Sequence, residues 1–296
     1  MKKIFVSGLL NIEHSLKVNS FPINYSPIEY PFFGVNSTIS GVGYNIFKAL
    51  TTLGSEVDLY SVVGDDNNGA LIKTALRREG INVKHIKTLE DEQTPESVVI
   101  YDKDGNRKVY CDLKNIQNIS LDADGINFDD YSFAIITNIN FNRALLPVFK
   151  KHGVRIVVDV HVLTDIDDPY NLEFMKYADF LFLSNEGCKG REYAFIQEIY
   201  HKYHNELIIM GCGDEGAIGY YGEDCYGFFQ KAVAPLGVVN TVGAGDALLS
   251  AYIHFWNKGY GDDPSLKAAV TFAGLKISQS GGSNGFVDEE TLKNYL

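Results

Sequence analysis

The stretch Asn240-Thr241-Val242-Gly243-Ala244-Gly245-Asp246 carries the strongest signal in this chain. It lies between an apolar run, 236–239, and a run with helical apolar spacing, 247–256. Small residues at the start of a helix leave backbone N–H groups unobstructed, and such groups bind phosphate oxygens well. Asp246 falls in the first turn, where an acidic residue is also common for purely structural reasons. If the anion site is real, it combines donors for a phosphoryl group with a base for an accepting hydroxyl.

A second glycine-rich segment lies near the N-terminus. Ser40-Gly41-Val42-Gly43-Tyr44-Asn45 opens a helical stretch, and a strand then leads to Val63-Gly64-Asp65-Asp66. Taken in this order, this segment and 240–246 resemble the two signatures of the ribokinase-like (PfkB) carbohydrate kinases, over nearly the whole chain. The resemblance implies a kinase that uses ATP and Mg²⁺ and phosphorylates a primary hydroxyl of a sugar.

The remaining pattern predicts the fold class. Strand-like apolar runs at 3–7, 57–62, 133–137, 155–159, 180–183 and 206–210 alternate with helical patterns at 70–78, 143–152 and 192–203. Such alternation is typical of β-α-β units in a mostly parallel sheet with helices on both faces. We therefore expect an α/β, three-layer ribokinase-like fold, with residues 1–296 forming a single kinase domain.

Two segments interrupt the alternation. Residues 97–112 read as a hairpin around Asp104-Gly105, and residues 9–33 are rich in aromatic residues and proline. We expect lid segments at about 9–35 and 96–112 that form a small β lid over the substrate, with Val98, Ile100 and Tyr110 closing above it. The alternative is two irregular surface excursions. The resemblance also implies a homodimer through the lid.

Several residues acquire a substrate role through the resemblance. Asn11 and Glu13 follow the first strand, where a parallel sheet places ligand groups. The family has Asp where this chain has Glu13, so the contact with a sugar hydroxyl is altered. Gly41, Gly43 and Asn45 match the second sugar-contacting turn.

Other residues acquire a nucleotide or metal role. In the resemblance Thr241 and Val242 join Gly243, Ala244 and Gly245 at the phosphates, and Gly213 and Gly216 bracket the nucleotide. Asn185 matches the first position of the family's Asn-x-x-Glu, whereas Cys188 occupies the Glu position, which leaves Glu186 as a candidate magnesium contact through water. Asn240 replaces a usual Asp at a monovalent-cation position, so we expect only weak activation by K⁺.

A rival motif is Gly211-Cys212-Gly213-Asp214-Glu215-Gly216, which matches the dinucleotide-binding pattern. That pattern needs a helix after the glycines and an acidic residue further on to hold a ribose hydroxyl. Residues 217–221 alternate like a strand instead, and 231–236 contain no acidic residue. A hairpin turn is the plain alternative.

Composition limits the partners. The 296 residues carry a net charge of −12, which argues against nucleic acid or anionic membrane as the main partner. The N-terminus reads as a buried strand without a signal cleavage site, and Cys111, Cys188, Cys212 and Cys225 form no paired motif, so we expect a cytoplasmic protein.

We therefore expect an ATP-dependent sugar kinase in which Asp246 is the catalytic base. The alternatives are a nucleoside kinase of the adenosine or pseudouridine type, a non-catalytic sugar-binding regulator and an NAD-binding protein.

Overall fold

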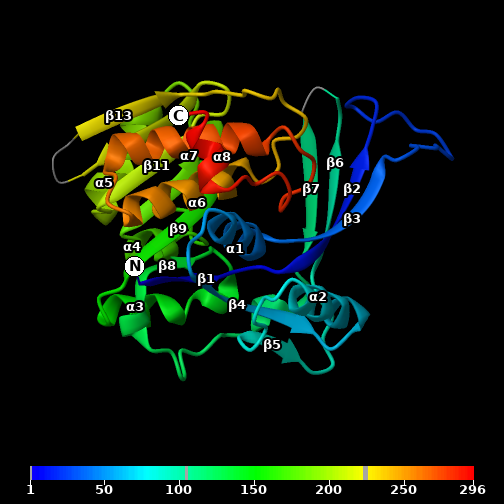
Figure 1. Cartoon of the computed structure of the whole chain (residues 1–296), viewed down its shortest axis with the longest axis horizontal. Helices are drawn as coiled ribbons and strands as arrows, with labels where there is room; N and C mark the ends of the chain where they lie inside the picture. Colours follow the sequence, from blue (N-terminus) through cyan, green and yellow to red (C-terminus); the bar gives the residue numbers. More distant parts are fainter. Residues whose placement is uncertain (1, 104–105, 223–225) are drawn as a thin grey trace.

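The computed structural model describes residues 2–103, 106–222 and 226–296. A nine-stranded sheet runs through the molecule in the order β13-β12-β11-β10-β9-β8-β1-β4-β5 (Figure 1). The strands from β11 to β5 in this order are parallel, and β12 and β13 are antiparallel at one edge. The strand bounds are β1 (Lys3–Ser7), β4 (Val57–Gly64), β5 (Ile86–Leu89), β8 (Tyr131–Ile136), β9 (Arg155–Val162), β10 (Phe180–Ser184), β11 (Leu207–Gly211), β12 (Gly216–Tyr221) and β13 (Tyr226–Lys231).

Helices cover both faces of this sheet because its strands are apolar on both sides. In β1, Ile4 and Val6 pack into one core cluster and Phe5 into the other. The first cluster joins the sheet to α1 (Val42–Thr52), α2 (Asn67–Arg78), α6 (Ala244–Asn257), α7 (Asp262–Lys276) and the short α8 (Glu289–Lys293). The second joins it to α3 (Leu145–Lys151), α4 (Leu172–Tyr177) and α5 (Glu192–Tyr203). The predicted three-layer α/β fold and the predicted strands are confirmed.

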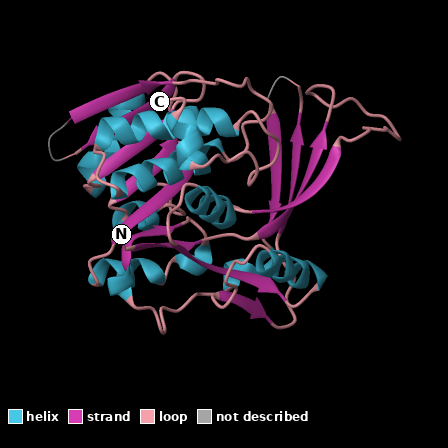
Figure 2. Cartoon of the chain, in the orientation of Figure 1, coloured by secondary structure: helices cyan, strands magenta, loops and turns pink. Residues whose placement is uncertain are grey.

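A second, smaller sheet stands beside this core (Figure 2). It has the order β3-β2-β6-β7 and is built from β2 (Asn11–Lys17), β3 (Val35–Ser40), β6 (Glu96–Tyr101) and β7 (Arg107–Asp112). Strands β6 and β7 pair antiparallel, as the hairpin prediction requires. The Asp104-Gly105 step of that prediction lies outside the described residues.

The register of the second sheet corrects one expectation. Glu13 pairs with Ser97, whereas Val98 pairs with His14 and Tyr110. Because successive side chains in a strand point to opposite faces, Val98, Ile100 and Tyr110 lie on the face away from Glu13. The expectation that these three residues close over the substrate is therefore wrong.

The face that Glu13 shares is largely polar. Register places Thr38, Ser97 and Cys111 beside Glu13, and Ser15 and Val99 one step further along. Ser15, Ser97 and Val99 are buried. This face offers hydroxyl and carboxylate groups to whatever lies between the two sheets.

The segment between β2 and β3 extends away from both sheets at the edge of the molecule (Figure 1). Most of its large apolar side chains are exposed, and Phe33 is fully so. In the described part of the chain, no helix combines the length and apolar character needed to span a membrane.

Candidate active site

The first turn of α6 forms an open cradle of backbone N–H groups. Gly243 precedes this helix at φ 78°, a left-handed conformation, and no side chain caps the helix start. A Cβ on Gly243 would lie 2.5 Å from the Gly282 carbonyl oxygen, so only glycine fits here. The turn before it is held because the Asn240 Oδ1 accepts a 2.7 Å hydrogen bond from the Val242 N–H. The helix start is therefore free to accept an anion from outside.

Asp246 lies in this turn and is buried, with 7% of its surface exposed. Its Oδ2 accepts a 2.8 Å hydrogen bond from the Asn45 side chain. Burial raises the pKa of Asp246 to about 6, although the Asn45 hydrogen bond opposes the shift. A carboxylate with such a pKa is ionised at neutral pH and is a stronger base than an exposed one, which suits a general base.

Hydrogen bonds continue from Asn45 to the second sheet. The Ser40 hydroxyl lies 2.9 Å from Glu13 Oε2 and 3.3 Å from Asn45 Oδ1. Asn11 donates from Nδ2 to the Ser97 hydroxyl at 2.9 Å. The structure thus links Asn45 and Glu13 to Asp246, and strand pairing places Asn11 opposite Ser40 in the same group.

One atom of this group points to a ligand. Asn11 is 2% exposed, yet its Oδ1 has no hydrogen-bond partner among the described residues. An unpaired buried acceptor is costly, so the site is prepared for a donor such as a hydroxyl.

Gly41 and Gly43 serve close backbone packing at this site. Gly41 has φ 109°, and a Cβ there would lie 2.4 Å from the Leu9 carbonyl oxygen. A Cβ on Gly43 would lie 2.6 Å from the Gly8 carbonyl carbon. The two glycines let α1 approach the end of β1, which positions Asn45 opposite Asp246.

The proposed nucleotide residues are more scattered. Gly213 lies in the turn between β11 and β12, and a Cβ on Gly216 would lie 2.0 Å from the Gln230 carbonyl oxygen, which is hairpin packing. The turn is followed by the antiparallel strand β12 and not by a helix, which counts against the dinucleotide motif.

Asn185 is hydrogen-bonded to an acidic residue outside the Asn-x-x-Glu positions. Cys188 is buried against Met210, and Glu186 is exposed. The Asn185 side chain donates instead to Glu192 Oε1 at 3.1 Å. Glu192 therefore holds Asn185 in place, a partner that the sequence pattern did not indicate.

Two further residues at the cradle were missed from sequence. Asp159, in the second half of β9, has its Oδ2 3.7 Å from the position of a Cβ on Gly245. Although burial opposes it, the adjacent His161 holds the pKa of Asp159 below its usual range. Desolvation lowers the pKa of the half-exposed His161, but the Asp159 carboxylate, 3.5 Å from its Nδ1, outweighs this effect and raises the pKa to about 9. The one available signal was their place at the carboxyl end of a parallel strand.

Arg107 and Lys276 also reach the cradle. Arg107, on β7 of the second sheet, donates to the Thr241 hydroxyl. Lys276, at the end of α7, is fully buried, and its ammonium donates to the Gly281 carbonyl at 2.6 Å. Burial lowers the pKa of Lys276 to about 8, against the opposing effect of the Asp246 and Glu13 carboxylates.

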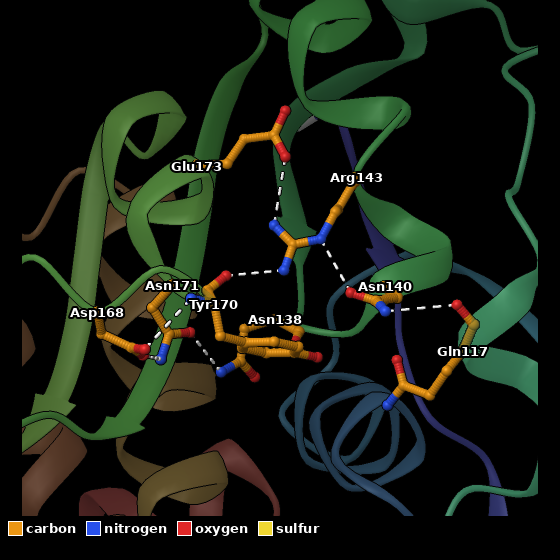
Figure 3. Close-up of polar contacts among 8 residues, drawn as sticks. All are labelled: Gln117, Asn138, Asn140, Arg143, Asp168, Tyr170, Asn171 and Glu173. Carbon is orange, nitrogen blue, oxygen red and sulfur yellow. Dashed lines mark hydrogen bonds and ion pairs between the residues drawn. The ribbon is translucent and has the colours of Figure 1, made fainter.

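A separate polar cluster fixes the loop that follows β8 (Figure 3). Arg143 contacts Glu173 at 3.2 Å, Asn140 Oδ1 at 2.9 Å and the Tyr170 carbonyl at 2.7 Å. This loop begins at Thr137, whose hydroxyl would lie 2.6 Å from a Cβ on Gly8. The cluster therefore fixes a loop that packs against Gly8, the residue after β1.

The site offers few direct ligands for a divalent ion. Within 2–103, 106–222 and 226–296, no three His, Cys, Asp or Glu side chains gather as a metal cluster. In nucleotide sites Mg²⁺ is held mainly by phosphates and water and does not require such a cluster.

Comparison with known proteins shows the family. A sequence profile of the pfkB family carbohydrate kinases matches residues 1–289. The chain therefore belongs to the pfkB family of carbohydrate kinases. Membership makes it a phosphotransferase that acts on a hydroxyl group.

Individual relatives are distant. The chain is 24% identical to the ribokinase of Lactococcus lactis over 305 residues, which cover 100% of this chain and 97% of the relative. It is 23% identical to the bifunctional protein HldE of Sulfurimonas denitrificans over 97% of this chain, but it spans only 63% of that protein's length.

Solved structures agree on the fold. The microbiome-derived acarbose kinase Mak1 superposes with a TM-score of 0.88 at 20% identity, covering 99% of this chain and 98% of that one. A putative ribokinase II from E. coli, in complex with ATP and Mg²⁺, gives 0.79 at 19% identity, covering 100% and 99%.

Proposed function

We propose that this chain transfers the γ-phosphate of ATP, carried with Mg²⁺, to a primary hydroxyl of a sugar. The observation that carries the proposal is the buried Asp246, hydrogen-bonded to Asn45, between an open helix N-terminus and a polar sheet face. This arrangement puts a base, an anion site and hydroxyl-binding groups within one site.

Each group of residues in the site has its own role in the proposed reaction. Asp246 accepts the proton of the substrate hydroxyl as its oxygen attacks phosphorus. The backbone N–H groups of Gly243, Ala244 and Gly245 stabilise the charge on the transferring group. Asn11, Glu13 and Asn45 hold the acceptor, and the second sheet limits access of water. Mg²⁺, when bound, neutralises charge on the nucleotide phosphates.

The nucleotide would lie along the segment that leads into the cradle. Leu236, Val238 and Val239 are 59%, 55% and 49% exposed, an apolar surface suited to a flat base. Thr241 and Val242 then face the phosphates, with Asn185, Gly213 and Gly216 on the neighbouring strand ends and Glu186 as a water-mediated magnesium contact.

The polar face of the second sheet favours a sugar over a nucleoside. Glu13, Ser15, Thr38 and Ser97 supply hydrogen-bonding groups, whereas Tyr110 lies on the opposite face. A nucleoside would draw on the aromatic segment between β2 and β3, which would have to fold over the site. A non-catalytic sugar-binding regulator would have no use for the Asp246 base.

The same aromatic segment supports a homodimer. Tyr25, Tyr30, Phe32 and Phe33 are 93%, 74%, 86% and 101% exposed. Exposed aromatic groups next to the open edge of β3 mark an interaction surface, and a second copy of the chain is the partner we propose.

A nucleotide-consumption screen over free sugars and nucleosides, with Asp246→Asn protein beside it, tests the function. We expect ATP to be consumed with a sugar by the wild type alone. Calorimetry should show binding of ATP or ADP with Mg²⁺ and none of NAD or NADP. Equal consumption by both proteins would refute the mechanism, and binding of NAD alone would return Gly211 to Gly216 to an oxidoreductase role.

A further inference from the structure

Lys276 is a charged side chain in an unusual place. It ends α7, has no exposed surface, and donates from its ammonium to the Gly281 carbonyl at 2.6 Å. Burying an ammonium is expensive unless other groups compensate, and lysines are rarely fully buried. A fully buried lysine at this position therefore needs a functional explanation.

The side chain lies directly behind the anion cradle. A Cβ on Gly243 would come within 3.1 Å of Lys276 Cε and within 2.5 Å of the Gly282 oxygen. The lysine stem, the loop after α7 and the first turn of α6 are thus in contact. Removing the ammonium would loosen the Gly281 carbonyl and, through it, the back of this turn.

The same loop also touches the acceptor side. A Cβ on Gly282 would lie 2.8 Å from both Asn45 Nδ2 and the Ser40 hydroxyl. The loop that Lys276 holds is therefore a wall common to the cradle and to the residues proposed to bind the sugar.

The charges that face Lys276 come from three elements. Asp246 on α6 and Glu13 on β2 favour the protonated lysine, whereas Arg107 on β7 opposes it. A phosphate in the cradle would add further negative charge. The ammonium is placed to compensate for carboxylates that the site needs.

A monovalent metal ion in this corner does not fit the residues present. The Asn240 Oδ1 already accepts from the Val242 N–H at 2.7 Å, and the Gly281 carbonyl already accepts from Lys276. Each oxygen keeps a second lone pair, but an ion on the Gly281 carbonyl would lie beside the Lys276 ammonium, and the two positive charges would repel each other.

We propose that Lys276 is a positioning residue for phosphoryl transfer, whose tethered ammonium supplies behind the cradle the positive charge that a bound K⁺ would otherwise provide. This rests on the proposed kinase function. It implies that the enzyme works without K⁺, because the chain carries its own cation.

The test compares salts on the wild type and on Lys276→Ala. With tetramethylammonium as the counter-ion, we expect wild-type turnover to match that in K⁺ or Na⁺ within about twofold, and the variant to lose about 10-fold to 100-fold in kcat, with a smaller change in KM. K⁺ or methylammonium should restore part of the loss, because either ion can enter the space left by the side chain. Independently of activity, KCl should raise the Tm of the variant more than tetramethylammonium chloride does, and should not do so for the wild type.

Two further variants separate charge from packing. Lys276→Met fills the space without the charge, so it should be slow and should not respond to K⁺. Lys267→Ala, an exposed position on the same helix, should behave as wild type. A Lys276→Met protein with wild-type kcat, or wild-type activity that rises saturably with K⁺, would overturn the proposal. If the wild type phosphorylates no sugar or nucleoside, the kinase function fails instead, and the salt dependence of Tm still decides where the cation lies.

Discussion

The N-termini of α2 and α6 follow similar glycine-containing turns but are finished in different ways. At α2, Asp66 accepts hydrogen bonds from the Gly69 N–H at 2.8 Å and from the Thr94 N–H at 2.9 Å. At α6, Gly243 stands in the capping position and offers no side chain. The first helix has a side-chain cap for its Gly69 N–H, whereas the second has no side-chain cap among the described residues, and at its start only the Ala244 N–H has a contact within the turn, at 3.3 Å to the Thr241 carbonyl. The difference teaches that an uncapped helix start beside a buried carboxylate is informative, whereas a capped one is ordinary structure.

The largest effect is expected at the carboxylate beside the open helix end. Asp246→Asn should lower kcat by about 10²-fold to 10⁴-fold, because it removes the base and preserves the shape of the side chain. Steady-state kinetics and calorimetric binding of ATP provide the measurement. If the variant kept most of the wild-type activity, Asp246 would not be the catalytic base.

The second-largest effect is expected from a substitution that obstructs the backbone N–H groups at the start of α6. Gly243→Ala adds a Cβ in contact with the Gly282 oxygen at a left-handed φ, so the turn must move. We expect roughly a tenfold or greater loss of ATP affinity, since the left-handed conformation alone costs about 1–2 kcal/mol. Gly259→Ala is the matched control, because that glycine also has a left-handed φ of 83° but no atom within 4 Å of its Cβ position. If both variants bind ATP equally, the cradle does not hold the phosphates.

At the capped N-terminus of α2 the effect should be on stability. Asp66→Ala should lower the free energy of unfolding by about 1–2 kcal/mol, because a helix cap is lost, and leave kcat nearly unchanged. Denaturant unfolding measures the free energy of unfolding, and the kinase assay measures kcat. A large fall in kcat with unchanged stability would instead make Asp65-Asp66 part of the active site.

The smallest effect concerns pH and stability. The folded-state pKa of Asp246 is raised to about 6 by burial, above the ordinary 3.8. Its contribution to stability is therefore present below the ordinary pKa and is lost as pH rises through about 6. Asp246→Asn should have a Tm a few degrees above the wild type at pH 7.5, and the gap should close toward pH 4. A gap that is independent of pH would mean that Asp246 is not perturbed by burial.

Sequence alone predicted the layers and most strand positions, because apolar runs and helical spacing follow directly from burial on both faces of a sheet. It also selected the 240–246 turn. It could not place Val98 and Tyr110, because the face of a strand depends on pairing register, and one residue reverses it.

The residues missed at the cradle share a physical reason. Asp159, His161, Arg107 and Lys276 come from three distant segments, and each lies at the cradle only because its segment folds against α6 or the turn before it. Only the folded arrangement shows which charges face one another. For the same reason the roles assigned to Asn185, Gly213 and Glu186 stay predictions.

The Gly282 loop has a thermodynamic consequence. Because one short segment abuts both Gly243 and the Ser40–Asn45 pair, any shift that a nucleotide causes in it is felt at the proposed acceptor site. Coupling between two binding equilibria is reciprocal, so the factor by which ATP changes the affinity for the acceptor must equal the factor by which the acceptor changes the affinity for ATP. The two substrates of this enzyme should therefore not bind independently.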